Sequence, residues 1–194
     1  MPYHYLDHIT RTPLAPEALE AMMPWLQERV GTSQGVHRDC VATRRALDRA
    51  RDQAAALLGC RSPESVLWTS SGAEALVTGV GALSKARRSG GRLLTTRVER
   101  PEILKSVQRL QEREGVMVDY APVGLDGLID LDQLRRLAGP DTFLIATHLA
   151  HHDSGAVQPL EAIAAIAQDC GARLLIDGTT GTGWATVDVD ALGI

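Results

Sequence analysis

The sequence predicts an α/β fold, a three-layer α/β/α sandwich built around a mostly parallel sheet. Two observations predict it. Short apolar runs alternate with helical segments of about 10–15 residues along most of the 194 residues, an order typical of βαβ units. The apolar runs also carry few polar residues, as strands do when helices cover both faces of their sheet. The length fits one domain and no repeat or low-complexity linker divides it, so we expect residues 1–194 to form a single domain.

The first expected elements are two helices. Residues 16–29 form the first, which Pro24 should interrupt or bend. Residues 39–58 form the second, because apolar residues recur there at helical spacing with arginines on the opposite face. Asp39 can cap the start of this helix and Gly59 can stop it.

The remaining expected elements alternate along the chain. The expected strands are 66–70, 92–99, 116–122, 142–150 and 172–178, and the expected helices are 71–87, 101–115, 130–139 and 159–171. Pro101 suits the first turn of its helix because it needs no N–H there. In open parallel sheets, ligands bind beyond the carboxyl ends of the strands. We therefore expect function at residues 69–72, 97–100, 148–153 and 177–182.

Composition excludes several classes of protein. No apolar run approaches the roughly 20 residues of a membrane span, and a net charge of −4 argues against a general nucleic-acid binder. The opening MPYHYLDHIT lacks the pattern of a signal peptide, so the expected location is cytoplasmic. Cys40, Cys60 and Cys170 lie far apart without metal-ligand spacing, so we expect buried reduced thiols and no metal site.

Residues Ser70, Ser71, Gly72 and Ala73 lead from an expected strand into an expected helix. The unpaired N–H groups and the positive end of a helix favour an anion such as a phosphate at such a turn. The alternative is a tight turn in which one of the serines caps the helix.

Asp177 stands at the end of an apolar strand, where an unpaired charge is costly. A protonated pyridine nitrogen would be a suitable partner for the carboxylate. The alternative is a carboxylate that accepts hydrogen bonds from the N–H groups of the next loop.

The order of several short segments resembles the cysteine desulfurase branch of the class V aminotransferases, over essentially the whole chain. These are pyridoxal-phosphate (PLP) enzymes of fold type I. The segments are Tyr5–His8, Thr12–Leu14, His37–Arg38, Thr69–Ala75, Thr96–Glu99, Gly127–Leu131, Gly155–Pro159 and Leu175–Asp177. The resemblance implies that the chain is a partial large domain of PLP fold type I.

The resemblance also implies roles for individual positions. Ser70, Ser71, Gly72 and Ala73 would bind the cofactor phosphate, and Asp177 would keep the pyridine nitrogen protonated. Arg100 replaces a histidine that stacks on the ring, His151 and His152 replace two asparagines beside it, and Thr180 replaces a glutamine at the ring hydroxyl. His151 or His152 could carry acid–base chemistry, and the alternative for this pair is a polar loop. Ala73 replaces a threonine of the phosphate loop.

The lysine that binds the cofactor covalently and the cysteine that carries sulfur lie, in this family, beyond the position of Ile194. The two lysines of the chain, Lys85 and Lys105, match neither place. The resemblance therefore implies an oligomer with a complementary polypeptide that supplies both groups, and an amino-acid substrate: cysteine converted to alanine, with sulfur transferred as a persulfide. The alternative is a catalytically inactive homologue that acts as a scaffold or regulatory subunit. Ala73, Arg100 and Thr180 favour the alternative, and Asp177 favours the enzyme.

Overall fold

The computed structural model describes residues 4–8, 11–85 and 91–194. The chain divides into two compact units, the first made of Met1–Leu57 and Arg61–Val66, the second of Leu58–Cys60 and Leu67–Ile194. The single domain expected from the sequence stays a prediction. No helix in the described ranges is both long enough and apolar enough to cross a membrane.

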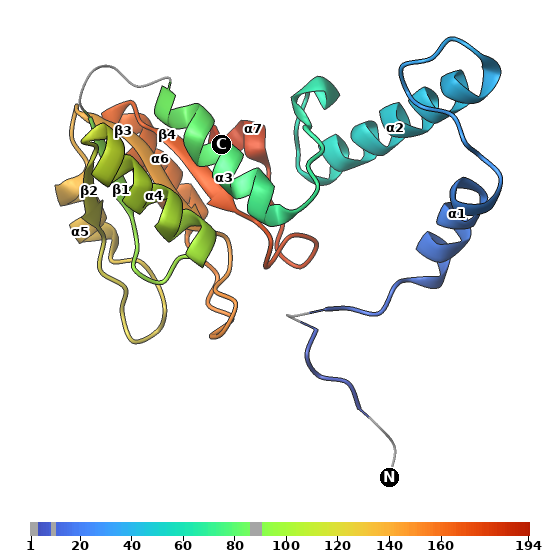
Figure 1. Ribbon diagram of the computed structural model, residues 1–194. Coiled ribbons are helices and arrows are strands. Elements are labelled where there is room, and N and C mark those ends of the chain that lie inside the picture. Colours follow the sequence, from blue (N-terminus) through green and yellow to red (C-terminus); the bar gives the residue numbers. More distant parts are fainter. Residues whose placement is uncertain (1–3, 9–10, 86–90) are drawn as a thin grey trace. The chain divides into compact units, whose positions relative to one another are not determined.

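The first unit is helical (Figure 1). It contains α1 (Pro16–Gln27), α2 (Arg38–Leu57) and the short 3-10 helix η1 (Pro63–Ser65). The prediction that Pro24 interrupts the first helix is wrong, because α1 continues to Gln27 and the carbonyl of Pro24 accepts the N–H of Glu28. Proline removes only one donor, and the helix ends a turn later. Asp39 does not cap α2 as expected, since it lies inside the first turn, whereas the helix stops before Gly59 with its φ of +65°.

The second unit holds a four-stranded parallel sheet with the strand order β2-β1-β3-β4. Its strands are β1 (Arg92–Thr95), β2 (Met117–Tyr120), β3 (Thr142–His148) and β4 (Arg173–Asp177). Its helices are α3 (Gly72–Lys85), α4 (Pro101–Glu114), α5 (Leu131–Leu137), α6 (Leu160–Cys170) and α7 (Val189–Leu192). Because all strands run the same way, their carboxyl ends form one edge of the sheet.

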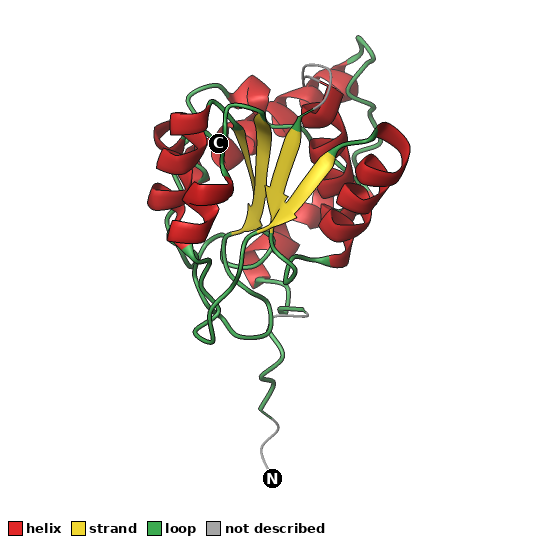
Figure 2. Cartoon of the chain, turned by 90° about the vertical axis from the view of Figure 1, so that its left-hand side faces the viewer, coloured by secondary structure: helices red, strands yellow, loops and turns green. Residues whose placement is uncertain are grey.

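Helices cover both faces of this sheet, which confirms the predicted three-layer α/β/α sandwich (Figure 2). Successive strand residues point to opposite faces. Leu93 and Leu144 pack with α3 and α4, whereas Leu94 and Ile145 pack with α5 and α6. All four leucine and isoleucine side chains are buried. This double burial explains why the strands are apolar along nearly their whole length.

Three expectations differ from the structure. Residues 66–70 form no strand, because a strand needs a hydrogen-bonded neighbour and no strand of the described chain pairs with this run. Leu67 is instead 79% exposed and Trp68 52% exposed. The expected strand 92–99 ends at Thr95, and α7 was not expected.

The cysteines are placed largely as expected. Cys40 is buried and Cys60 and Cys170 are partly buried, and no disulfide joins them in the part of the chain that the structure describes. The end of the expected helix 71–87 lies outside the described residues, which follow α3 as far as Lys85.

Candidate functional site

The buried carboxylate of Asp177 lies at the carboxyl end of β4 and is 2% exposed. Its Oδ1 accepts the N–H of Thr179 at 2.9 Å. Its Oδ2 is buried, and the described residues give it no hydrogen-bond donor. The nearest cation is the guanidinium of Arg100, whose Nε lies 3.9 Å from Oδ2. Asp177 therefore carries one unused buried acceptor, which is costly unless a ligand supplies the donor.

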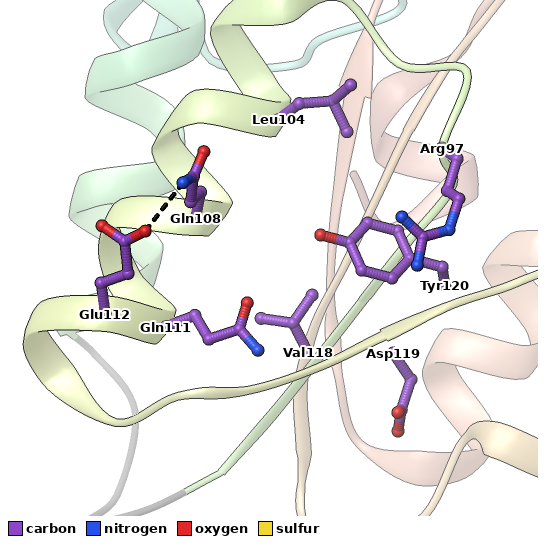
Figure 3. A pocket seen from close by; sticks show the side chains of 8 residues that line it. All are labelled: Arg97, Leu104, Gln108, Gln111, Glu112, Val118, Asp119 and Tyr120. Carbon is purple, nitrogen blue, oxygen red and sulfur yellow. Dashed lines mark hydrogen bonds between the residues drawn. The ribbon is translucent and has the colours of Figure 1, made fainter.

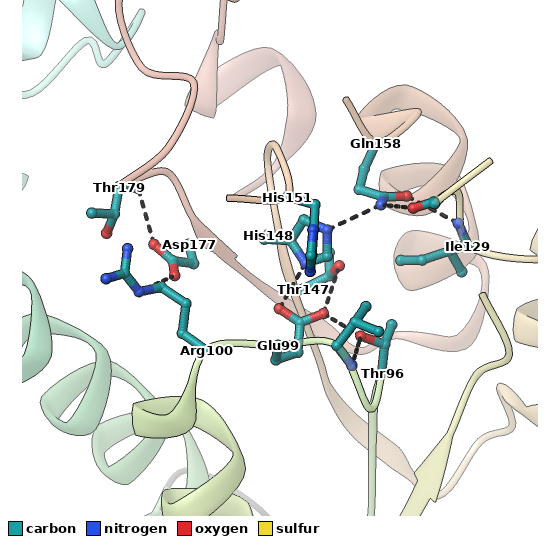
Figure 4. A network of polar contacts seen from close by, with 12 residues as sticks. Thr96, Glu99, Arg100, Ile129, Thr147, His148, His151, Gln158, Asp177 and Thr179 are labelled. Carbon is teal, nitrogen blue, oxygen red and sulfur yellow. Dashed lines mark hydrogen bonds and ion pairs between the residues drawn. The ribbon is translucent and has the colours of Figure 1, made fainter. Parts of the chain in front are cut away.

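Arg100 approaches Asp177 from the segment after β1, which β3 separates from β4 in the sheet (Figure 4). It precedes α4 in the segment that follows β1, so the parallel arrangement brings it to the same edge as Asp177. Its Nε also lies 4.0 Å from Oε2 of Glu102, and its side chain is 36% exposed. The guanidinium is thus held by charge rather than by short hydrogen bonds, and one of its faces is open to solvent or a ligand.

The turn before α3 is a capped helix start. Ser71 Oγ accepts the N–H of Glu74 at 3.2 Å, while the Glu74 carboxylate accepts the hydroxyl of Ser70 at 2.6 Å and its N–H at 2.7 Å. The first contact is the N-cap half of a capping box, whereas the Glu74 carboxylate binds Ser70, one residue before the cap, instead of the N–H of Ser71. The hydroxyl of Ser70, and then its N–H, lower the pKa of Glu74 below its ordinary value. The N–H groups of Gly72 and Ala73 have no acceptor within the helix and stay available to an anion.

This turn lies beside the loop that follows Asp177. A Cβ built on Gly72 would stand 3.5 Å from Oγ1 of Thr179, the residue whose N–H binds the Asp177 carboxylate. The part-buried Thr180 is the next residue of the same loop. The structure therefore brings the residues predicted at the phosphate, the pyridine nitrogen and the ring hydroxyl to one edge of the sheet.

His151 and His152 lie in the loop after β3, with ring centroids 4.7 Å apart. His151 Nδ1 accepts the N–H groups of Asp153 and Ser154 at 3.3 and 3.2 Å, so the neutral ring carries its hydrogen on Nε2. The ring can then donate a proton from Nε2. The ligand atoms of His151, His152 and Asp153 lie within 4.8 Å of one another. A metal bound to His151 would need the lone pair of Nδ1, which already accepts the N–H groups of Asp153 and Ser154.

Sequence reasoning assigned no role to a set of buried polar residues next to this site, although Glu99 and His148 lie in the ranges 97–100 and 148–153 that were expected to carry function. Glu99, His148 and Gln158 are each about 3% exposed. His148 is the last residue of β3, and Glu99 lies in the segment that follows β1. Both therefore lie near the carboxyl ends of the strands, as Asp177 does. A polar residue at the end of an apolar run was the signal that could have identified them.

A groove of the second unit lies elsewhere, between α4 and the edge strand β2 (Figure 3). Its volume is about 820 Å³, and the Arg97 guanidinium stacks 4.3 Å from the Tyr120 ring beside it. The lining residues are Arg97, Leu104, Gln108, Gln111, Glu112, Val118, Asp119 and Tyr120. Arg97 lies in the range 97–100 that was expected to carry function, but none of the lining residues was assigned a role. The chemistry that the sequence points to is at the carboxyl edge, not in this groove.

Comparisons with known proteins identify the family and the fold. The family described as aminotransferase class-V matches residues 4–194. A cysteine desulfurase of Cereibacter sphaeroides is 35% identical over 92% of this chain and 46% of its own length. The cysteine desulfurase IscS of Dictyoglomus turgidum is 31% identical over 98% of this chain and 48% of its own.

Solved structures show the same fold. A NifS-like protein superposes with a TM-score of 0.90 at 23% identity, over 96% of this chain and 51% of its own. A structure described as SspA in complex with cysteine gives a TM-score of 0.90 at 28% identity, over 98% of this chain and 55% of its own. The chain thus spans about half the length of the relatives that it matches.

Proposed function

The chain belongs to the class-V aminotransferase family, whose members depend on PLP, and from this premise we propose that it is part of a cysteine desulfurase-like enzyme. In the proposed reaction cysteine becomes alanine, and its sulfur passes on as a persulfide. The observation that carries the proposal is the unused Oδ2 of the buried Asp177. A carboxylate kept buried with one open acceptor is poised for a ligand that brings a hydrogen bond and a positive charge.

The residues present fit PLP at its ring end. A protonated pyridine nitrogen would give Asp177 Oδ2 the donor that it lacks, and the low exposure of the carboxylate would strengthen the bond. When bound, PLP supplies an electron sink for the carbanion of an amino acid. Asp177 holds the proton on the ring nitrogen, and this is the role that makes the sink effective.

The phosphate end would be bound mainly by backbone. A phosphate at the start of α3 would meet the N–H groups of Gly72 and Ala73 and the positive end of the helix. Ser70 can add its hydroxyl only by releasing the Glu74 carboxylate. Ala73 has no hydroxyl to add. We therefore propose a weaker phosphate site than the same turn would build with a hydroxyl side chain at position 73.

Two further groups would act beside the ring. The guanidinium plane of Arg100 can stack on an aromatic ring, but it stays charged and carries no proton. His151, with its hydrogen on Nε2, can donate or regain a proton, and the adjacent His152 is the second candidate. Thr180, in the loop after Asp177, would face the ring hydroxyl.

We also propose that a complementary polypeptide supplies the reactive lysine and the sulfur-accepting cysteine. Lys85 ends the 14-residue α3, about 20 Å from Gly72 at the other end of the helix. Lys105 is exposed on α4. The run 66–70 pairs with no strand of the described chain, and its Leu67 and Trp68 are exposed. We propose that a partner covers this apolar surface. A cytoplasmic oligomer that takes an amino-acid substrate remains part of this proposal.

A second candidate function is a catalytically inactive scaffold or regulatory subunit. The observation that favours it is the Glu74 carboxylate, which occupies both Ser70 donors at the phosphate turn. Ala73 and Arg100 point the same way, since neither supplies the hydroxyl or the imidazole found in relatives that this part of the sequence resembles.

The two functions differ in a direct experiment. The chain is titrated with PLP, alone and together with the C-terminal half of the Cereibacter sphaeroides cysteine desulfurase. Alanine formed from cysteine is measured, together with the sulfide that an added thiol reductant releases from the persulfide. PLP binding with cysteine-dependent alanine in the mixture supports the enzyme. A mixture that assembles but neither binds PLP nor forms alanine supports the scaffold.

A further inference from the structure

Glu99 is the centre of a buried polar network beside Asp177 (Figure 4). Its side chain is fully buried, with 0% exposure. Oε1 accepts the hydroxyls of Thr96 at 2.7 Å and Thr147 at 3.2 Å, and Oε2 lies 3.0 Å from Nδ1 of His148. A buried carboxylate is tolerable only with donors of this kind. The network therefore has a charged acceptor at its core, and each of its three neighbours points a polar atom at it.

The orientation of Gln158 determines which ring nitrogen of His148 carries the hydrogen. Ile129 N–H donates to Oε1 of Gln158 at 3.0 Å, and Nε2 of Gln158 donates to the carbonyl of Gly127 at 2.8 Å. These two backbone groups exclude the flipped amide. The second amide hydrogen then faces Nε2 of His148 at 3.1 Å, which must accept it. His148 is therefore neutral, and its Nδ1–H donates to Glu99.

The network is attached to the site on both sides of Asp177. Glu99 directly precedes Arg100, whose Nε is 3.9 Å from Asp177 Oδ2. His148 is the residue paired with Asp177 in the register of β3 and β4. The His148 ring also meets the His151 ring edge-on, with centroids 5.4 Å apart. A shift of Glu99 or His148 would thus be passed to Arg100 on one side and to His151 on the other.

We propose that Glu99, His148 and Gln158 are positioning residues that hold Arg100 and His151 around Asp177, with His148 kept as the neutral Nδ1–H tautomer. None of the three touches the ligand; each acts through a neighbour. The inference rests on the proposed function in that Asp177 is taken as the cofactor carboxylate. The geometry of the network itself does not depend on a cofactor, and this separates the tests.

The first test reads the tautomer in the full chain without cofactor. Ring-nitrogen nuclear magnetic resonance of histidine-labelled protein distinguishes the tautomers, and the His148 signals are assigned from their loss in His148→Asn. The expected result is a hydrogen on Nδ1 and a bare Nε2. A hydrogen on Nε2, whether the ring is neutral or charged, overturns the proposal.

The second test moves the network and watches the site. In Glu99→Gln, the amide oxygen can still accept the two threonine hydroxyls, but its NH₂ group faces the Nδ1–H of His148. Because two donors then meet, the ring signals of His151 and the Nε signal of Arg100 should shift. The control Glu112→Gln makes the same change on the exposed face of α4, where Glu112 accepts Gln108 at 2.7 Å, and should shift neither. Unmoved His151 and Arg100 signals in Glu99→Gln overturn the positioning role.

A second variant covers a failure to fold. If Glu99→Gln does not fold, Gln158→Glu asks the same question from the other end, because a second carboxylate opposite Nε2 should add a hydrogen there and give a charged ring with a hydrogen on both nitrogens. A His148 whose Nε2 stays bare in Gln158→Glu, or His151 and Arg100 signals that do not move, contradicts the proposal.

The third test uses PLP itself, with affinity measured by absorbance or fluorescence titration. Glu99→Gln should bind PLP roughly tenfold more weakly, the effect expected from one lost buried hydrogen bond, and Glu112→Gln should bind like the unaltered chain. If PLP binds neither to the unaltered chain nor to its mixture with the C-terminal half of the Cereibacter sphaeroides desulfurase, the proposed function fails, while the resonance tests still decide the positioning role. If PLP binds and Glu99→Gln binds it equally well, the positioning role fails and the proposed function stands.

Discussion

Replacing Asp177 by asparagine should separate ligand binding from folding. The introduced asparagine would keep the size of the side chain, and its amide oxygen would still accept the N–H of Thr179, now at 2.9 Å. The change removes the charge and puts an NH₂ group in place of the unused Oδ2. A donor at that position faces the donor of a protonated pyridine, so the interaction that we assign to the cofactor is lost.

The expected size of each effect follows from the contacts. A hydrogen bond to a charged group contributes about 1.5–3 kcal/mol, so PLP affinity should fall about 10- to 100-fold. Stability should change by less than about 1 kcal/mol. The ion pair to Arg100 is long, at 3.9 Å, and its guanidinium is 36% exposed and screened by solvent. Removing an incompletely bonded buried charge also lowers the desolvation cost of folding.

The assay is a pair of measurements on the same protein. PLP affinity is obtained by absorbance titration, and the free energy of unfolding by urea denaturation followed by circular dichroism. Asp141→Asn is a matched control, since Asp141 is an aspartate at the opposite ends of the strands, 3.3 Å from Nε of Arg92. This control should leave PLP affinity unchanged.

Two outcomes would refute the reasoning. If Asp177→Asn binds PLP as tightly as the unaltered chain, Asp177 is not the partner of the pyridine nitrogen. If the variant instead loses about 3 kcal/mol or more of stability, the carboxylate is a structural element whose value lies in the loop that it holds.

Four further predictions concern other parts of the second unit. Because hydrogen bonds from Ser70 lower the pKa of Glu74, its stabilising contribution should be present above the ordinary value of 4.5 and lost as the pH falls through the lower folded value, and acid unfolding of Glu74→Gln should lack this component. Ser71→Ala removes the helix cap on the Glu74 N–H and should lower the free energy of unfolding by about 1 kcal/mol in urea denaturation, whereas an unchanged midpoint would exclude the cap. Leu144→Ala, at a fully buried position in the sheet centre, should cost about 2–5 kcal/mol by the same method, and a cost below that of Ser71→Ala would contradict the core assignment. After borohydride treatment of the chain with PLP, peptide mass spectrometry should find no specific adduct at Lys85 or Lys105, and a stoichiometric adduct at either would refute the need for a lysine from a partner.

Local patterns were enough to predict most of the architecture. The runs that form β1, β3 and β4 are apolar on both faces because helices bury both faces of the sheet. A continuous apolar run can be recognised in the sequence without knowing which strand lies beside it. Helix starts and stops also have local signals, as at Pro101 and at Gly59, which has a φ of +65° after α2. Run 66–70 shows the limit. Its residues favour a strand, but a strand exists only when another strand accepts its hydrogen bonds.

The candidate site was predictable residue by residue but not as a set of contacts. Asp177 and Arg100 were identified individually, one from the cost of a charge at a strand end and the other from a family resemblance. Their approach to 3.9 Å depends on the parallel order β2-β1-β3-β4, which brings the end of β4 and the segment after β1 to one edge.

The sequence by itself therefore determined the layers, and it indicated the edge and the carboxylate at which we propose the site. Only the tertiary structure decided how the charges are partnered. Glu99 and His148 are 49 residues apart, and no local pattern relates them. Their pairing follows from burial, because a carboxylate and an imidazole removed from water must find each other or another polar group. Asp177 Oδ2 has no hydrogen-bond donor among the described residues, and this can be seen only in the tertiary structure.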